Sequence, residues 1–205
     1  MDFSALLGQS EEKYAEYLLA QDHLYNKISE KQRSRLRDQA IMCGKNAANR
    51  FPTHDLWEYC QQEAIEIEYF TEEVKAENFR FVLAEFQLPN QILINQTLLK
   101  EAQAFLSELN FLSDQRVDEI LLAHELYHYI ENQQELFTIK KNLTYQTGPF
   151  KRAARVHALS EIAAMSFAQT LLGLNFSPMV LNIVLLHNVA PEYSKELVEL
   201  LLVID

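Results

Sequence analysis

The sequence predicts an α+β fold that is predominantly helical, with a small sheet of about three strands packed on a pair of helices and a helical N-terminal extension. Three observations predict it. Glycine and proline are scarce, at 4 and 5 of 205 residues, which favours helices joined by few tight turns. Apolar residues recur at spacings of three and four over most of the chain. Between Ile65 and Asn95 this period gives way to the apolar–polar alternation that is typical of strands.

The same patterns place the individual elements. Helices are expected at residues 4–48 (two or more helices), 53–62, 98–109, 114–131, 150–172, 177–187 and 191–203. Strands are expected at 65–69, 79–86 and 91–95, and a further short strand at 136–139 within a loop over 132–149. The simplest division is an N-terminal extension over residues 1–50 and a domain over 51–205. One continuous domain over 1–205 is the alternative.

Composition excludes several classes of function. The chain carries 18 Lys and Arg against 29 Asp and Glu, a net charge of −11, and such a surface repels phosphate backbones, so we expect no nucleic-acid binding. Cys43 and Cys60 form no Cys-x-x-Cys pair, which argues against redox or thiolate-metal chemistry. We find no signal peptide at residues 1–4 and no apolar run of about 18 residues. These features predict a cytoplasmic protein without membrane contact, and they leave its oligomeric state open.

One motif carries chemistry. His124-Glu125-Leu126-Tyr127-His128 fits the pattern His-Glu-x-x-His. Residues i and i+4 lie on one helix face, so both imidazoles can reach one cation. Glu125 points to the flank of that face, where it can act as a base toward a water that zinc has acidified.

The surroundings of the motif favour a metal site. Val117, Leu121, His124 and His128 recur at spacings of three and four, so the imidazoles continue an apolar stripe. Two histidines buried in such a row need partners. The alternative is that each is a core histidine, hydrogen-bonded to a backbone carbonyl.

Glu161 is the expected third ligand. It lies 33 residues beyond His128, in a row of mainly apolar and small residues that we place on one helix face: Ala154, His157, Glu161, Met165, Ala168 and Leu172. Coordination to a cation would relieve the cost of a carboxylate there. A salt bridge to Arg152 or Arg155 is the alternative. The helix also contains small residues that would let it approach a neighbour closely, namely Ala154, Ala163, Ala164 and Ala168.

Other side chains are weaker candidates. His157 precedes Glu161 by four residues. Four roles are open for it: a metal ligand, a hydrogen-bond donor to a ligand, an electrophilic group near the reacting oxygen, or a structural residue. Tyr145 lies in the loop before that helix and is a candidate for stabilising an oxyanion. Tyr127 and Tyr129 point away from the histidine face, and packing is their expected role.

The two candidate helices together resemble the ImmA/IrrE family of zinc metallopeptidases, which are gluzincin-like. The resemblance rests on the run Ile120-Leu121-Leu122-Ala123-His124-Glu125-Leu126-Tyr127-His128 and on Glu161-Ile162-Ala163-Ala164-Met165-Ser166-Phe167-Ala168, and it covers roughly residues 55–172. It implies Zn²⁺ held by His124, His128 and Glu161, with Glu125 as general base. Met165 stands where the family usually has Asn.

The resemblance also implies an activity. Family members cleave a regulatory protein, often a transcriptional repressor, and many carry a helix-turn-helix domain that residues 1–50 do not show. We therefore expect a zinc metallopeptidase, a hydrolase whose partner is a protein or peptide substrate, with a zincin-like domain over residues 51–205. The alternatives are a zinc-binding regulatory or scaffold protein without peptidase activity, and a purely structural helical protein whose motif is accidental.

Overall fold

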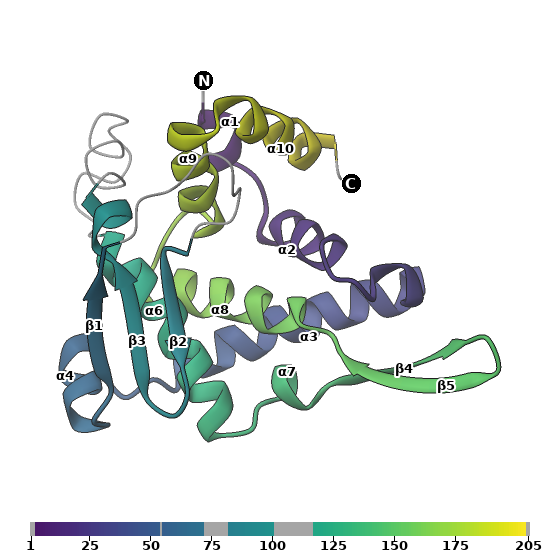
Figure 1. Ribbon diagram of the computed structural model, residues 1–205, viewed down its shortest axis with the longest axis horizontal. Coiled ribbons are helices and arrows are strands. Elements are labelled where there is room, and N and C mark those ends of the chain that lie inside the picture. The colour runs from purple at the N-terminus through teal and green to yellow at the C-terminus, as the bar shows by residue number, and fades with distance from the viewer. Residues whose placement is uncertain (1–2, 54, 72–81, 101–116, 204–205) are drawn as a thin grey trace.

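The computed structural model describes residues 3–53, 55–71, 82–100 and 117–203 (Figure 1). Its helices are α1 (Ser4–Leu7), α2 (Glu11–Ala20), the 3-10 helix η1 (Tyr25–Lys27), α3 (Glu30–Asn49), α4 (Leu56–Gln62), α6 (Val117–Gln133), α7 (Phe137–Lys140), α8 (Ala158–Leu171), α9 (Met179–Val189) and α10 (Pro191–Val203). Its strands are β1 (Glu66–Phe70), β2 (Ala84–Gln87), β3 (Gln91–Asn95), β4 (Asn142–Thr147) and β5 (Phe150–Arg155). The predicted α+β, predominantly helical class is confirmed. Within the described residues, no helix combines the length and apolarity needed to cross a membrane.

Several helix starts follow directly from local sequence. Ser10 caps α2 by accepting the backbone N–H of Lys13, and Asp55 caps α4 by accepting that of Glu58. Ser29 opens α3 with a capping box to Gln32. Such caps satisfy backbone donors that have no partner within the helix.

The three-stranded sheet has the order β1–β3–β2, with β3 parallel to β1 and antiparallel to β2. A turn that contains Pro89 and Asn90 joins β2 to β3, and the side chain of Asn90 donates to the carbonyl of Ala64. The sheet packs on α6, since Ile92 and Ile94 are fully buried in the main hydrophobic cluster together with residues of that helix. Parts of the predictions for 79–86 and 98–109, and the start of the helix predicted at 114, lie outside the described residues.

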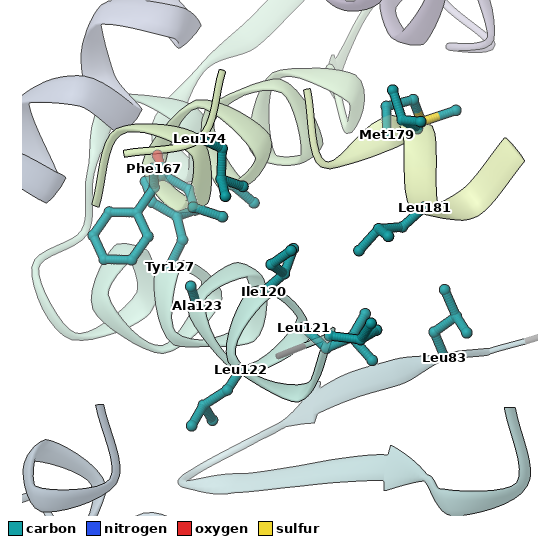
Figure 2. Close-up of a cluster of buried hydrophobic side chains, with 14 of the residues drawn as sticks. Leu83, Ile120, Leu121, Leu122, Ala123, Tyr127, Phe167, Leu174, Met179 and Leu181 are labelled. Atoms are coloured by element: carbon teal, nitrogen blue, oxygen red, sulfur yellow. The ribbon is translucent and has the colours of Figure 1, made fainter. Parts of the chain in front are cut away.

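Helix α6 lies against this sheet, and α8 and α3 extend away from it side by side (Figure 1). Figure 2 shows the contact between α6 and α8, where the rings of Tyr127 and Phe167 lie 5.8 Å apart. On its other side α8 meets α3, and a side chain at Gly44 would overlap the carbonyl oxygen of Ala163. The close approach predicted from small residues is therefore confirmed at Ala163.

Two predictions between α6 and α8 are wrong. Residues 137–140 form helix α7 and not a strand, and residues 150–155 form strand β5 and not the start of a helix. β4 and β5 pair as a hairpin around Gly148, whose φ of +57° suits a tight turn. The spacing of Ala154 and Glu161 had suggested one helix face, but Ala154 lies opposite Leu143 in the hairpin. Cross-strand pairing thus outweighs the helix propensity of Ala153 and Ala154.

Candidate metal centre

The two histidines of the motif share one face of α6. Their Nε2 atoms are 3.3 Å apart, and both side chains are largely buried, at 13% exposed for His124 and 15% for His128. Val117 and Leu121 are buried on the same helix, as the apolar stripe predicts. One helical turn therefore brings both imidazole nitrogens to one point.

Glu161 reaches the same point from α8. Its Oε2 lies 3.3 Å from Nε2 of His124, and its Oε1 lies 3.6 Å from Nε2 of His128. The side chain is 48% exposed because it borders a cleft. A salt bridge from Glu161 to Arg152 or Arg155 was the alternative, and Arg155 pairs with Glu131 instead.

The spacing of these atoms fits a metal ion. Bonds of 2.0–2.1 Å to a tetrahedral zinc place neighbouring ligand atoms about 3.3 Å apart. The three observed distances are 3.3, 3.3 and 3.6 Å. Two imidazole nitrogens and the two oxygens of one carboxylate at this spacing need protons or a cation between them. His124, His128 and Glu161 can therefore hold a metal ion.

The charges of the site also favour a cation. Partial burial opposes ionisation of Glu161, but His124 and His128 outweigh it and hold the pKa of Glu161 at about 2. Burial disfavours a charged His128 as well, yet the surrounding carboxylates, Glu131 foremost, raise its pKa to about 9. A field that holds a proton on His128 attracts a metal cation in its place.

Glu125 lies beside this group and is 6% exposed. Its Oε2 accepts the backbone N–H of Phe86 in β2 at 2.8 Å. Burial raises the pKa of Glu125, and the neighbouring His124 and His128 only partly oppose the rise. A carboxylate with a raised pKa is a stronger base than an ordinary carboxylate, which suits it to taking up a proton.

A cleft of about 720 Å³ opens over the group. Its walls are β2, α6, the start of α8, and helices α9 and α10. β2 is an outer strand of its sheet, and the N–H of Phe86 points away from β3 toward Glu125. The edge of β2 therefore borders the cleft.

Sequence reasoning missed Glu131. This carboxylate is 2% exposed, and its Oε1 lies 3.0 Å from Nδ1 of His128. Thr138 donates to it at 2.6 Å, and Ser160 donates a second hydroxyl. Burial would raise the pKa of Glu131, but these hydrogen bonds keep it below its usual value. The available signal was its position three residues after His128, which places both on one helix face.

The weaker candidates lie elsewhere. His157 precedes α8, is exposed and borders the cleft, with its ring 6.1 Å from that of His23. Tyr145 lies in β4 and packs with a second hydrophobic cluster, which also contains Leu143. Neither belongs to the group that can hold a metal.

The two tyrosines of the motif helix are buried, as expected for packing residues. The Tyr127 hydroxyl lies 2.8 Å from Thr138 Oγ1, and Tyr129 donates to Glu63 at 3.2 Å. Tyr127 thereby supports Thr138, which in turn donates to Glu131.

Comparisons with known proteins assign no function to this group of residues. No model of a protein family, no curated protein and no solved structure matches this chain.

Proposed function

We propose that this protein is a zinc metallopeptidase of the ImmA/IrrE type that cleaves a protein substrate. The resemblance to that family implies that the substrate is a regulatory protein. The observation that carries the proposal is the convergence of His124, His128 and Glu161 with Glu125 beside them. Two imidazoles and one carboxylate are a donor set of catalytic zinc sites, in which a fourth position stays open. The cleft gives that position access to a substrate.

A bound zinc ion would acidify a water molecule and polarise the scissile carbonyl. Glu125 would take the proton from that water and deliver it to the leaving nitrogen. Its raised pKa supports both steps, because a strongly acidic carboxyl would be a poor base. On substrate approach the carboxylate would turn from the N–H of Phe86, which would then be free to pair with the substrate.

The outward-facing backbone groups at the edge of β2 are evidence that the substrate is a polypeptide. In an antiparallel pair, alternate residues direct their backbone groups away from the partner strand. The outward N–H of Phe86 therefore implies the same direction for the backbone of Ala84. An extended peptide would add to this edge by main-chain hydrogen bonds, beside the zinc ligands.

A second candidate is a zinc-binding regulatory or scaffold protein without peptidase activity. The hydrogen bond from the Phe86 N–H to Glu125 favours this second function, because it links the sheet to α6 and so gives Glu125 a structural role. In that case zinc would stabilise the fold, and Glu125 would take no part in hydrolysis.

Zinc content and hydrolysis separate these functions. We expect purified wild type to contain zinc and His124→Ala to lack it, by elemental analysis. With unfolded casein as substrate, Glu125→Gln should keep its zinc and lose at least about 100-fold in kcat/KM. Glu135→Gln, which removes an exposed carboxylate of the same charge, is the matched control.

Each outcome favours one function. Zinc without hydrolysis in wild type favours the regulatory protein, and equal hydrolysis by Glu125→Gln excludes Glu125 as the base. Folded wild type that binds no zinc contradicts both functions.

A further inference from the structure

Positive charge is concentrated in one part of this acidic chain. Residues 136–160 hold five of its 18 Lys and Arg residues and none of its 29 Asp and Glu residues. The rest of the chain therefore has 13 cationic and 29 anionic side chains. The five cations are Lys140, Lys141, Lys151, Arg152 and Arg155. Three of the five lie in strand β5.

The hairpin β4–β5 projects from the helical body (Figure 1). Six residues in each strand give it a length of about 20 Å. Its base is anchored, because Leu143 is buried in the second hydrophobic cluster. Toward the turn the side chains are exposed, and Phe150 is 67% exposed. The outer half is thus available to a partner.

The cations of β5 fall on two faces. Alternation along the strand places Lys151 and Arg155 on one face and Arg152 on the other, next to Phe150 at the turn. Arg155 also borders the cleft of the metal centre. The face with Lys151 and Arg155 therefore leads from the cleft toward the tip of the hairpin.

The outer cations are not neutralised by the protein itself. Lys151 and Arg152 are exposed and pair with no acidic side chain of the described residues, whereas Lys140 pairs with Glu135 and Arg155 with Glu131. The tip lies about two Debye lengths from the base at physiological ionic strength. Its charge is therefore screened from the acidic body and remains effective toward a partner.

We propose that the β4–β5 hairpin docks an acidic segment of the protein substrate, through Lys151 and Arg152, and so directs the adjoining chain into the cleft. The inference rests on the proposed peptidase function and names the class of substrate. A polypeptide is favoured over a nucleic acid for two reasons. Outside residues 136–160 the chain has 13 cationic and 29 anionic side chains, and this body repels the long phosphate backbone of a nucleic acid. The exposed Phe150 beside Arg152 is the aromatic and arginine combination that is enriched at protein interfaces.

Binding to the hairpin is measured without hydrolysis. The probe is a fluorescein-labelled peptide of alternating glutamate and alanine, titrated by anisotropy against Glu125→Gln, and the glutamine–alanine peptide is the neutral probe. Adding Lys151→Glu and Arg152→Glu should weaken binding of the acidic peptide at least about fivefold and flatten its dependence on salt. The matched control adds Arg50→Glu and Lys195→Glu, two exposed cations in other parts of the fold, and should bind almost as tightly as Glu125→Gln alone.

The outcomes distinguish this inference from the proposed function. Equal loss of binding in the hairpin variant and in the control overturns the docking role, while zinc content and casein hydrolysis still test the peptidase. The docking role is also overturned if a double-stranded DNA oligonucleotide binds more tightly than the acidic peptide and the hairpin variant loses this DNA binding. A wild-type dimer that the hairpin substitutions convert to a monomer in sedimentation overturns it as well, since the partner would then be a second copy of the chain.

Discussion

Glu131 and His128 lie one helical turn apart on α6, with 3.0 Å between the carboxylate Oε1 and the imidazole Nδ1. The hydrogen bonds to Glu131 keep this buried group ionised and therefore an acceptor. Nδ1 of His128 therefore donates to Glu131, and once the imidazole loses its other proton to a metal ion, the lone pair of Nε2 is directed at His124 and Glu161. Thr138 and Ser160 fix the carboxylate from α7 and α8, so three helices hold one imidazole in the orientation that a metal requires.

This relationship predicts that Glu131→Gln weakens zinc binding about 10- to 100-fold. The amide keeps the volume and can still accept from Nδ1, but it lacks the charge that makes the imidazole a stronger ligand. Competition with a chromophoric chelator measures the affinity, and circular dichroism confirms the fold. Glu135→Gln removes an equal charge from an exposed position and should leave the affinity unchanged. Equal affinity in all three proteins would show that Glu131 serves only the packing of the helices.

Local signals in the sequence predicted much of the fold. Asp55 marks the start of α4, and α10 begins at Pro191 as expected. The pair of histidines in the group that can hold a metal ion was predictable, because helical geometry alone links them. Glu161 was predicted because a carboxylate in an apolar row needs a partner. The structure brings it to the histidines, but its side chain is 48% exposed at the cleft and Ala154 of the row lies in β5.

The β4–β5 hairpin and Glu131 depend on tertiary contacts. Ala153 and Ala154 favour helix locally, and only pairing with β4 makes them a strand. Glu131 resembles any acidic residue at the end of a helix until α7 and α8 bring Thr138 and Ser160 to it. Sequence periodicity describes one element at a time, so it cannot show contacts among three.

Gly44 is predicted to control the distance between α3 and α8. A Cβ at this position would overlap the carbonyl oxygen of Ala163 and lie 2.9 Å from Cβ of Ser166. Backbone cannot move aside as a flexible side chain can, so Gly44→Ala should lower the free energy of unfolding by about 1–3 kcal/mol. This loss would appear despite the higher helix propensity of alanine. Urea denaturation measures it, and Asn46→Ala at an exposed position of α3 is the control. A stabilised Gly44→Ala would mean that the two helices can separate freely.

Asp22 is predicted to stabilise the start of α8. Its side chain is 1% exposed, and the carboxylate accepts the backbone N–H of Ala158 at 3.0 Å and that of Leu24 at 2.8 Å. Asp22→Ala removes both acceptors and should cost about 1–2 kcal/mol in thermal or urea unfolding. Glu196→Ala, at an exposed position of α10, should have a much smaller effect. An unchanged stability of Asp22→Ala would show that water replaces the carboxylate at no cost.

The two cysteines are predicted to differ sharply in reactivity and to play no part in metal binding. Cys60 is 2% exposed, and burial raises the pKa of its thiol to about 12. At pH 8 only about one in ten thousand such thiols is ionised, and the thiolate is the species that attacks a disulfide reagent. Cys43 is only partly buried, with Sγ 3.5 Å from the Tyr127 hydroxyl.

A chromogenic disulfide reagent should therefore modify Cys43 first in the native protein and reach Cys60 only on unfolding, with Cys43→Ser and Cys60→Ser assigning the two phases. Zinc should stay bound during the first phase, because its expected ligands are imidazoles and a carboxylate. Rapid modification of Cys60 in the native protein would mean that α4 opens readily from the main cluster, and zinc release on modification of Cys43 would place a thiolate among the ligands.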